Sequence, residues 1–183
     1  VYNADNAWTR AMAGSAAGAR IGFGTGPDAR VRLSGWTVPD GRSTTGTLEG
    51  DGGRHPVVLP MLGGHYLLNL AAAVGACLAL GMEGPAILAR LGALRPARMR
   101  GEIRDFPGGI QLIDDTYNSN PEAMQAVVES LARWPGRPRT LLVAGEMREL
   151  GPPSASLHRE TGERIAQLGC ALLLGVQGDA AHL

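Results

Sequence analysis

Lysine is absent from this chain of 183 residues: all 17 basic residues are arginines, and 17 acidic residues bring the formal net charge to zero. The absence excludes a Gly-x-x-x-x-Gly-Lys-Ser/Thr phosphate loop within these residues, because the lysine of that loop reaches the phosphates. The sequence also has no basic stripe, so its charges give no support for binding to nucleic acid.

Aromatic residues make up only 4% of the chain, and its two cysteines are isolated without the spacing of a metal site. The most apolar segment, residues 67–80, is too short to span a bilayer and contains Asn69, so we expect a buried helix and no membrane partner. No basic and apolar leader precedes the first strand. The chain starts at Val1 without methionine, and we interpret it as part of a longer protein.

The first part of the chain, residues 1–95, alternates short apolar runs with glycine-rich turns and then continues into helices. The patterns predict helices over 8–17, 65–80 and 84–94, and strands over 20–24, 29–33, 44–48 and 56–62. The segment Gly-Phe-Gly-Thr-Gly at 22–26 precedes no clear helix, so we interpret it as a hairpin turn.

The pattern changes after Pro96. Apolar strands at 110–113, 140–144 and 171–176 recur about thirty residues apart, and helical segments at 121–134 and 154–168 fill the intervals. Such a βαβαβ series predicts an α/β fold with a parallel, doubly wound sheet. We therefore expect two domains, residues 1–95 and 96–183, the second of them incomplete.

A dense polar cluster, Asp-Asp-Thr-Tyr-Asn-Ser-Asn-Pro at 114–121, follows the strand predicted over 110–113. Open α/β sheets bind their ligands at the carboxyl ends of strands, which is where this cluster falls. Asp115 can accept hydrogen bonds from ribose hydroxyls; the alternative is that it caps the helix expected from Pro121. The cluster has more polar side chains than capping needs, so we favour a binding function.

Two further places carry candidate binding residues. His65 and Asn69 are four residues apart on one face of a predicted helix, where the Asn69 amide can bond a ligand base or neighbouring backbone. Arg98 lies in the segment between the two domains, and its guanidinium suits a phosphate. The alternative for Arg98 is an ordinary solvated surface residue.

A second loop, Gly-Glu-Met-Arg-Glu-Leu-Gly at 145–151, follows the next predicted strand in the same way. Its two carboxylates suit an ammonium group or a metal ion, or they belong to a solvated turn. His158, on the following helix, is expected at the surface or at a helix cap. No Ser/His/Asp triad and no zinc cluster can be assembled from the spacing.

Taken together, these blocks resemble the Mur ligase family. The resemblance rests on residues 3–6, 64–65 with Asn69 and 71–72, 97–99, 114–121 with Met124, and 145–151 with His158. The blocks at 114–121 and 145–151 are the most specific, and they are similar to those of members that add D-alanyl-D-alanine rather than a single amino acid.

The resemblance implies a cytoplasmic step of peptidoglycan synthesis with ATP and Mg²⁺ as cofactors. ATP phosphorylates the terminal carboxylate of UDP-N-acetylmuramoyl-tripeptide, and the amine of D-alanyl-D-alanine attacks the acyl phosphate to form an amide. Residues 1–95 then correspond to the later part of the central ATP-binding domain, and 96–183 to an incomplete C-terminal Rossmann-like domain.

By the same resemblance, Asn69 contacts the adenine, with His65 beside it in the nucleotide site. Arg98 contacts the phosphates and Asp115 the ribose. The remaining residues of this set lie near the incoming dipeptide or position the closed domain; they are Tyr117, Asn118 and Asn120.

The family's Gly-Lys-Thr loop, its magnesium-binding Glu and His and its carbamylated lysine would all precede Val1. We therefore expect neither a catalytic residue nor a metal ligand on this chain, and no ligation by these residues alone. Two alternatives remain: a ligase resembling folylpolyglutamate synthetase, and a non-catalytic nucleotide-binding module that kept the fold.

Overall fold

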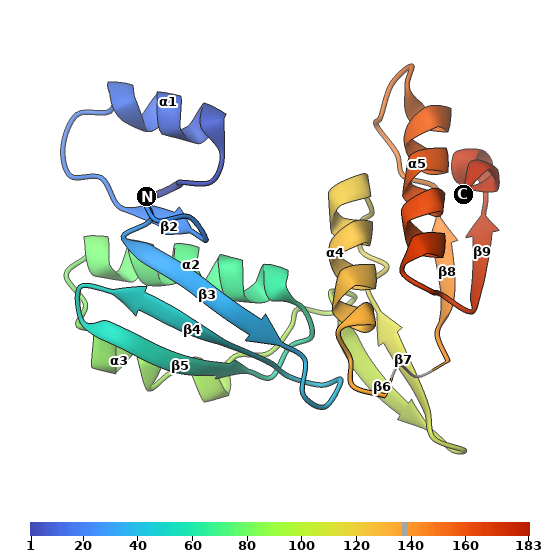
Figure 1. Ribbon diagram of the computed structural model, residues 1–183, viewed down its shortest axis with the longest axis horizontal. Coiled ribbons are helices and arrows are strands. Elements are labelled where there is room, and N and C mark those ends of the chain that lie inside the picture. Colours follow the sequence, from blue (N-terminus) through green and yellow to red (C-terminus); the bar gives the residue numbers. More distant parts are fainter. Residues whose placement is uncertain (137–138) are drawn as a thin grey trace. The chain divides into compact units, whose positions relative to one another are not determined.

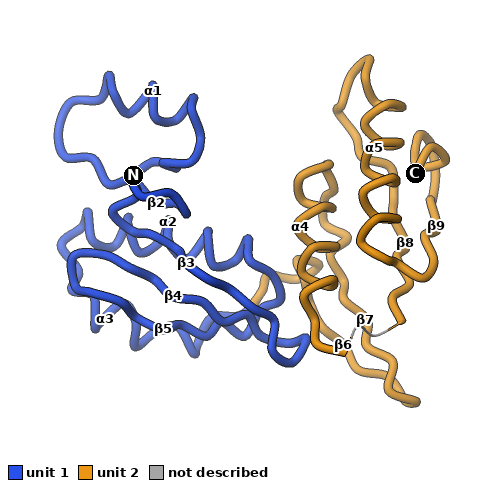
Figure 2. Tube along the Cα trace, in the orientation of Figure 1, with its two compact units in different colours: residues 1–95 blue, residues 96–183 orange. Residues whose placement is uncertain are grey.

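The computed structural model describes residues 1–136 and 139–183, which form two compact units, Val1–Arg95 and Pro96–Leu183 (Figure 2). Both units combine helices with β-strands, so the predicted α/β class is confirmed. No helix in the described part of the chain combines the length and the apolar character needed to cross a membrane.

Unit 1 contains a five-stranded sheet in the order β1–β2–β3–β4–β5. Its strands are β1 (Tyr2–Asn3), β2 (Gly22–Gly24), β3 (Val31–Thr37), β4 (Thr44–Gly50) and β5 (Gly53–Leu59). Its helices are α1 (Ala7–Ser15), α2 (Gly64–Ala79), α3 (Gly84–Leu88) and the short 3₁₀ turn η1 (Leu91–Ala93). β1, β2 and β3 are parallel, whereas β3, β4 and β5 form an antiparallel meander.

The core of unit 1 lies between α2 and the sheet (Figure 1). α2 buries Leu67, Leu70, Ala71 and Val74, a spacing that places all four on one face of a helix. Gly46 of β4 leaves room for this face, because a Cβ there would lie 2.8 Å from a methyl group of Leu67. The apolar run therefore predicted a buried helix correctly.

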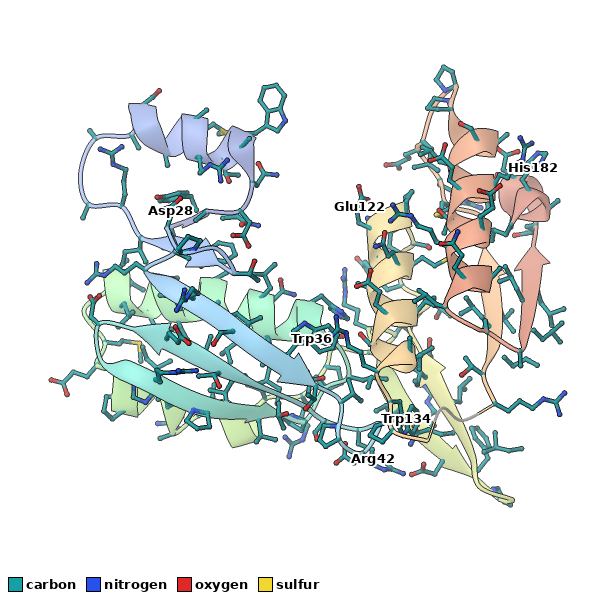
Figure 3. All side chains as sticks on the ribbon, viewed as in Figure 1. Asp28, Trp36, Arg42, Glu122, Trp134 and His182 are labelled. Carbon is teal, nitrogen blue, oxygen red and sulfur yellow. The ribbon has the colours of Figure 1, made fainter. Side chains whose placement is uncertain are left out.

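The start of α2 is held by the sheet. The hydroxyl of Thr44, fully buried, donates to the carbonyl of Met61 at 2.9 Å and accepts from the backbone N–H of Gly63 at 2.7 Å. Trp36 packs against Gly64, where any Cβ would collide with the indole (Figure 3). These contacts fix the end of α2 on which His65 and Asn69 lie.

The prediction of a hairpin turn at residues 22–26 is wrong. β2 and β3 are parallel, and the turn between them folds around the carboxylate of Asp5. That carboxylate accepts from the backbone N–H groups of Thr25 at 2.7 Å and Gly26 at 2.9 Å. Partial burial raises the pKa of Asp5, but these hydrogen bonds outweigh it and hold the pKa below its ordinary value. The glycine-rich turn thus already binds an anion, its own Asp5.

Unit 2 contains two pairs of strands and two longer helices. One helix connects the first pair to the second, and the other connects the two strands of the second pair. Its elements are β6 (Glu102–Phe106), β7 (Ile110–Asp114), α4 (Pro121–Ala132), β8 (Leu141–Gly145), α5 (Ser154–Gln167), β9 (Leu172–Val176) and the 3₁₀ turn η2 (Gly178–His182). β8 and β9 are parallel and joined through α5, as the repeat predicted. β7 instead pairs antiparallel with β6, a strand that the sequence did not predict, and its described ladder does not include β8.

The β8–β9 pair has two different faces. On one face Ala144 is buried, and Ile165 of α5, which lies beside the pair in Figure 1, is 1% exposed. The opposite face presents five side chains that are each between 44% and 59% exposed: Leu141, Val143, Leu172, Leu174 and Val176. The described residues therefore cover only one side of a ribbon that is apolar on both.

Candidate functional site

The polar loop between β7 and α4, residues 115–120, is shaped by the residues at its two ends. Asp114 accepts from the hydroxyl of Thr116 at 2.6 Å and from the backbone N–H of the same residue at 3.3 Å. The Thr116 hydroxyl holds the pKa of Asp114 below its ordinary value, and the charges of Arg104 and Arg98 lower it further. Asp114 is therefore engaged in the turn itself.

The other end of the loop is fixed by Asn120. Its side-chain oxygen accepts from the backbone N–H of Ala123 at 2.7 Å, and Pro121 occupies the first position of α4. This is the arrangement of a helix N-cap. The alternative in which Asp115 caps the helix is wrong, because Asn120 does so.

Asp115 is half-buried, and within the described residues its carboxylate makes no hydrogen bond or ion pair. Asn118 is exposed on the same loop. The two adjacent carboxylates therefore differ in role, since Asp114 is engaged in the turn and Asp115 remains available to a ligand. A carboxylate in that state accepts hydrogen bonds from hydroxyl groups such as those of a ribose.

Arg98 is exposed and lies close enough to lower the pKa of Asp114. The segment that carries it is attached to the loop, because the backbone N–H of Tyr117 donates to the carbonyl of Met99 at 3.1 Å. Arg100 lies over the ring of Tyr117, with its guanidinium carbon 4.0 Å from the ring centroid. Unit 2 therefore brings Arg98 and Asp115, expected from the sequence at a phosphate and at a ribose, to neighbouring parts of its surface.

The two remaining predicted residues lie in unit 1, on the first turns of α2. The ring of His65 is half-buried and lies 4.3 Å from that of Tyr66, centroid to centroid. Asn69 is exposed, and among the described residues its amide makes no hydrogen bond, so the alternative in which it bonds neighbouring backbone is wrong. The amide projects from the same helix whose other face is buried against the sheet, where a planar ligand can reach it.

The second loop, residues 145–151, is held by contacts with α5 and η2. The backbone N–H of Met147 donates to Nε2 of His158 at 2.9 Å, and Nδ1 of that ring faces the carbonyl of Ser154 at 2.9 Å. His158 is fully buried, so its expected place at the surface or at a cap is wrong. Glu146 accepts from the backbone N–H of Asp179 at 3.2 Å. Only Arg148 and Glu149 of this loop are exposed and charged.

Neither loop gathers the ligands of a metal ion. Among residues 1–136 and 139–183, no group of three or more His, Cys, Asp or Glu side chains is arranged to hold one. A cleft of about 250 Å³ runs between α4 and α5, but of the predicted site residues none lines its described walls. The site is therefore an open surface around Arg98 and Asp115 rather than an enclosed pocket.

Residues 99–182 match the model of the Mur ligase glutamate ligase domain. A UDP-N-acetylmuramoyl-tripeptide–D-alanyl-D-alanine ligase of Escherichia coli is 35% identical over 136 residues, which are 74% of this chain and 29% of that protein. The chain belongs to the Mur ligase family. Its match begins directly after Arg98 and includes the whole polar loop.

Solved structures of the family agree with the fold. MurF from Acinetobacter baumannii superimposes with a TM-score of 0.79 at 29% identity, over 88% of this chain and 34% of that one. MurF from Thermotoga maritima, in complex with ADP, superimposes with a TM-score of 0.78 at 30% identity. The match covers 88% of this chain and 36% of that one. This member of the Mur ligase family thus spans about a third of the length of the relatives it matches.

Sequence reasoning missed the residues that hold the site together. It gave no role to Arg100 and did not consider Arg104, whose guanidinium lies 3.6 Å from the carboxylate of Asp114. Both contacts cross the β6–β7 hairpin, and β6 was not predicted. The cap at Asn120, by contrast, had a clear signal in the sequence, an asparagine directly before a proline at a helix start.

Asn120→Ala tests the division between capping and binding in the polar loop. We expect a loss of about 0.5–2 kcal/mol of unfolding free energy, because the N–H of Ala123 loses its partner. Asn120→Asp keeps an acceptor and should restore most of that loss. Asn118→Ala, on the same loop, should leave stability nearly unchanged. Urea unfolding measures all three; equal losses for Asn118→Ala and Asn120→Ala would contradict the assignment.

Proposed function

We propose that this chain is the later part of a cytoplasmic, ATP-dependent ligase that adds D-alanyl-D-alanine to UDP-N-acetylmuramoyl-tripeptide. The supporting observation is the polar loop after β7, which leaves Asp115 and Asn118 available in a chain 35% identical to a ligase named for that reaction. Structures such as a folylpolyglutamate synthase at 16% identity share the fold alone. The specific likeness is therefore to the dipeptide-adding members.

In this proposal, residues 1–95 are the later part of the central ATP-binding domain, and 96–183 belong to the Rossmann-like C-terminal domain. The division of the structure at Arg95–Pro96 is compatible with this assignment. Neither unit has a phosphate loop with a lysine, because the chain contains none. The full reaction accordingly needs groups beyond those described, and these residues alone should not ligate.

The residues present fit a nucleoside triphosphate. Asn69 offers an exposed amide, which pairs with a base edge by donating and accepting at once. Arg98 offers an exposed guanidinium for phosphate oxygens, and Asp115 offers an unengaged carboxylate for ribose hydroxyls. His65 lies one turn before Asn69, next to the glycines that begin α2, and belongs to the same nucleotide site.

Mg²⁺ is proposed as the companion of ATP in the complete ligase, but the described residues do not supply a site for it. Glu146, the best carboxylate of the second loop, is engaged by the backbone of Asp179 and lies 3.9 Å from Arg148. We therefore assign no metal ligand to this chain. Its contribution to charge neutralisation is Arg98.

ATP, when bound, supplies the phosphoryl group that activates the tripeptide carboxylate. The residues of this chain bind and orient: Asp115 fixes the ribose and Arg98 screens the negative charge of the phosphates. Asn118 and Tyr117 are proposed to face the incoming D-alanyl-D-alanine. Asn120 holds the start of α4 with its oxygen and keeps its amide nitrogen for substrate. Such a site works by position, not by acid–base chemistry.

The reaction is tested with the complete protein that contains this chain. We expect phosphate release from ATP to require both UDP-N-acetylmuramoyl-tripeptide and D-alanyl-D-alanine, with a product whose mass is increased by the dipeptide. Replacement of D-alanyl-D-alanine by L-glutamate, with a folate acceptor, should give no release. Glutamate-dependent release would favour the folylpolyglutamate synthetase alternative, and nucleotide binding without any release would favour the non-catalytic module.

Arg98→Ala should raise the KM for ATP or lower turnover by about tenfold or more in the complete protein, since a charge-assisted phosphate contact contributes about 1.5–3 kcal/mol. Arg95→Ala is the matched control. Its guanidinium donates to the backbone carbonyls of Gly92 and Leu94, and the residue is also exposed. Unchanged kinetics in Arg98→Ala would remove this residue from the nucleotide site.

Asn69→Ala should weaken the preference for adenine over guanine nucleotides, because an amide that both donates and accepts can distinguish the hydrogen-bonding edges of the two bases. Its exposure predicts little change in stability. The measurement is the ratio of kcat/KM for ATP and GTP in the complete protein. A ratio equal to that of the unchanged protein would show that Asn69 does not read the base.

A further inference from the structure

Arg98 lies in a turn whose geometry is fixed by its neighbours. The backbone N–H of Arg100 donates to the carbonyl of Ala97 at 3.1 Å, which closes a four-residue turn with Arg98 at its second position. Met99, at the third position, has a φ of 59°. A positive φ at this position is typical of type II turns and is unusual for a residue other than glycine or asparagine.

Both backbone groups of Met99 are engaged. Arg104 holds the pKa of the Glu102 carboxyl below its ordinary value, and the backbone N–H of Met99, directed at the same carboxylate, lowers it further. The carbonyl of Met99 accepts from the N–H of Tyr117 at 3.1 Å. The unusual conformation of Met99 is thus maintained by β6 on one side and by the polar loop on the other.

The side chain of Arg100 closes the same junction from outside. Its guanidinium lies 4.0 Å from the ring centroid of Tyr117, a cation–π contact between two exposed side chains. The contact covers one face of the phenol. It also joins the turn that carries Arg98 to the loop that carries Asp115.

We propose that Arg100 is a positioning residue which, through Tyr117, fixes the spacing between Arg98 and Asp115. The inference rests on the proposed function, in which Arg98 contacts the phosphates and Asp115 the ribose of one nucleotide. A nucleotide sets the distance between these groups, so binding is strongest when the protein holds the matching spacing beforehand. One face of the Tyr117 ring then packs against Arg100. Only the hydroxyl and the other ring face remain for contact with substrate.

Hydrogen exchange at the backbone amide of residue 117 in the complete protein, without nucleotide or substrate, tests the contact directly. Arg100→Ala should accelerate exchange about two- to fivefold, the effect of losing one exposed cation–π contact. Tyr117→Leu should do the same, because it removes the ring. Tyr117→Phe keeps the ring face and Arg100→Lys keeps a cation, so both should remain closer to the unchanged protein.

The second measurement is the KM for ATP in the complete protein. Arg100→Ala should raise it by a similar factor with little change in kcat, although Arg100 touches no nucleotide. Arg159→Ala removes an exposed positive charge from α5 and should change neither quantity. Exchange at the amide of Ile165 in α5 reports whether each variant is folded; if Arg100→Ala is not, Arg100→Lys and Tyr117→Leu carry the test.

Two outcomes would overturn the proposal. Unchanged exchange at residue 117 in both Arg100→Ala and Tyr117→Leu would show that the contact does not hold the loop. Accelerated exchange with an unchanged KM for ATP would show that the contact does not position the nucleotide site. The exchange experiment does not depend on ligase activity. If the proposed ligase reaction failed, the exchange rates would still show whether the Arg100–Tyr117 contact holds the loop.

Discussion

The backbone hydrogen bonds at the junction of β7 and α4 are the constraint on which the candidate site depends. A strand that ends and a helix that begins leave N–H groups without backbone partners, and neighbouring side chains can accept from them. Asp114 binds the N–H of Thr116 and Asn120 binds that of Ala123, one at each end of the loop. Because the ends satisfy the backbone, the side chains of Asp115 and Asn118 between them make no hydrogen bond to any residue that the structure describes.

The loop after β8 meets the same constraint in the opposite way. There the partner comes from outside the loop: His158 of α5 accepts the N–H of Met147, and Glu146 turns away to the N–H of Asp179. Glu146, one of the two carboxylates that the sequence suggested for an ammonium group or a metal ion, therefore holds backbone instead, as does His158. The loops at the carboxyl ends of β7 and β8 thus differ in which of their polar side chains bond backbone groups.

The sequence predicted the parts of this structure that depend on local periodicity. The buried face of α2 and the β8–α5–β9 unit both follow from apolar spacing. The cap at Asn120 was not predicted, although an asparagine directly before a proline is a signal for one. Burial of His158 was not predictable, because its partner is a backbone group on a separate loop. Nor was the Arg100–Tyr117 contact, because it requires knowing that β6 pairs with β7 and returns the chain to its starting point.

The apolar sequences of β8 and β9 are typical of strands that are covered on both faces, whereas the described residues cover only one face of the pair. Parallel strands are typically covered on both faces, and continuous apolar runs such as those of β8 and β9 reflect that condition. Here α5 covers one face, while Val143 and Leu174 pair in register on the other and remain 59% and 44% exposed. Both strands therefore have apolar side chains on the exposed face as well as on the face that α5 covers. Their register is nevertheless set, because Ala144, on the covered face, is 3% exposed, and a shift by one residue would place an exposed position there.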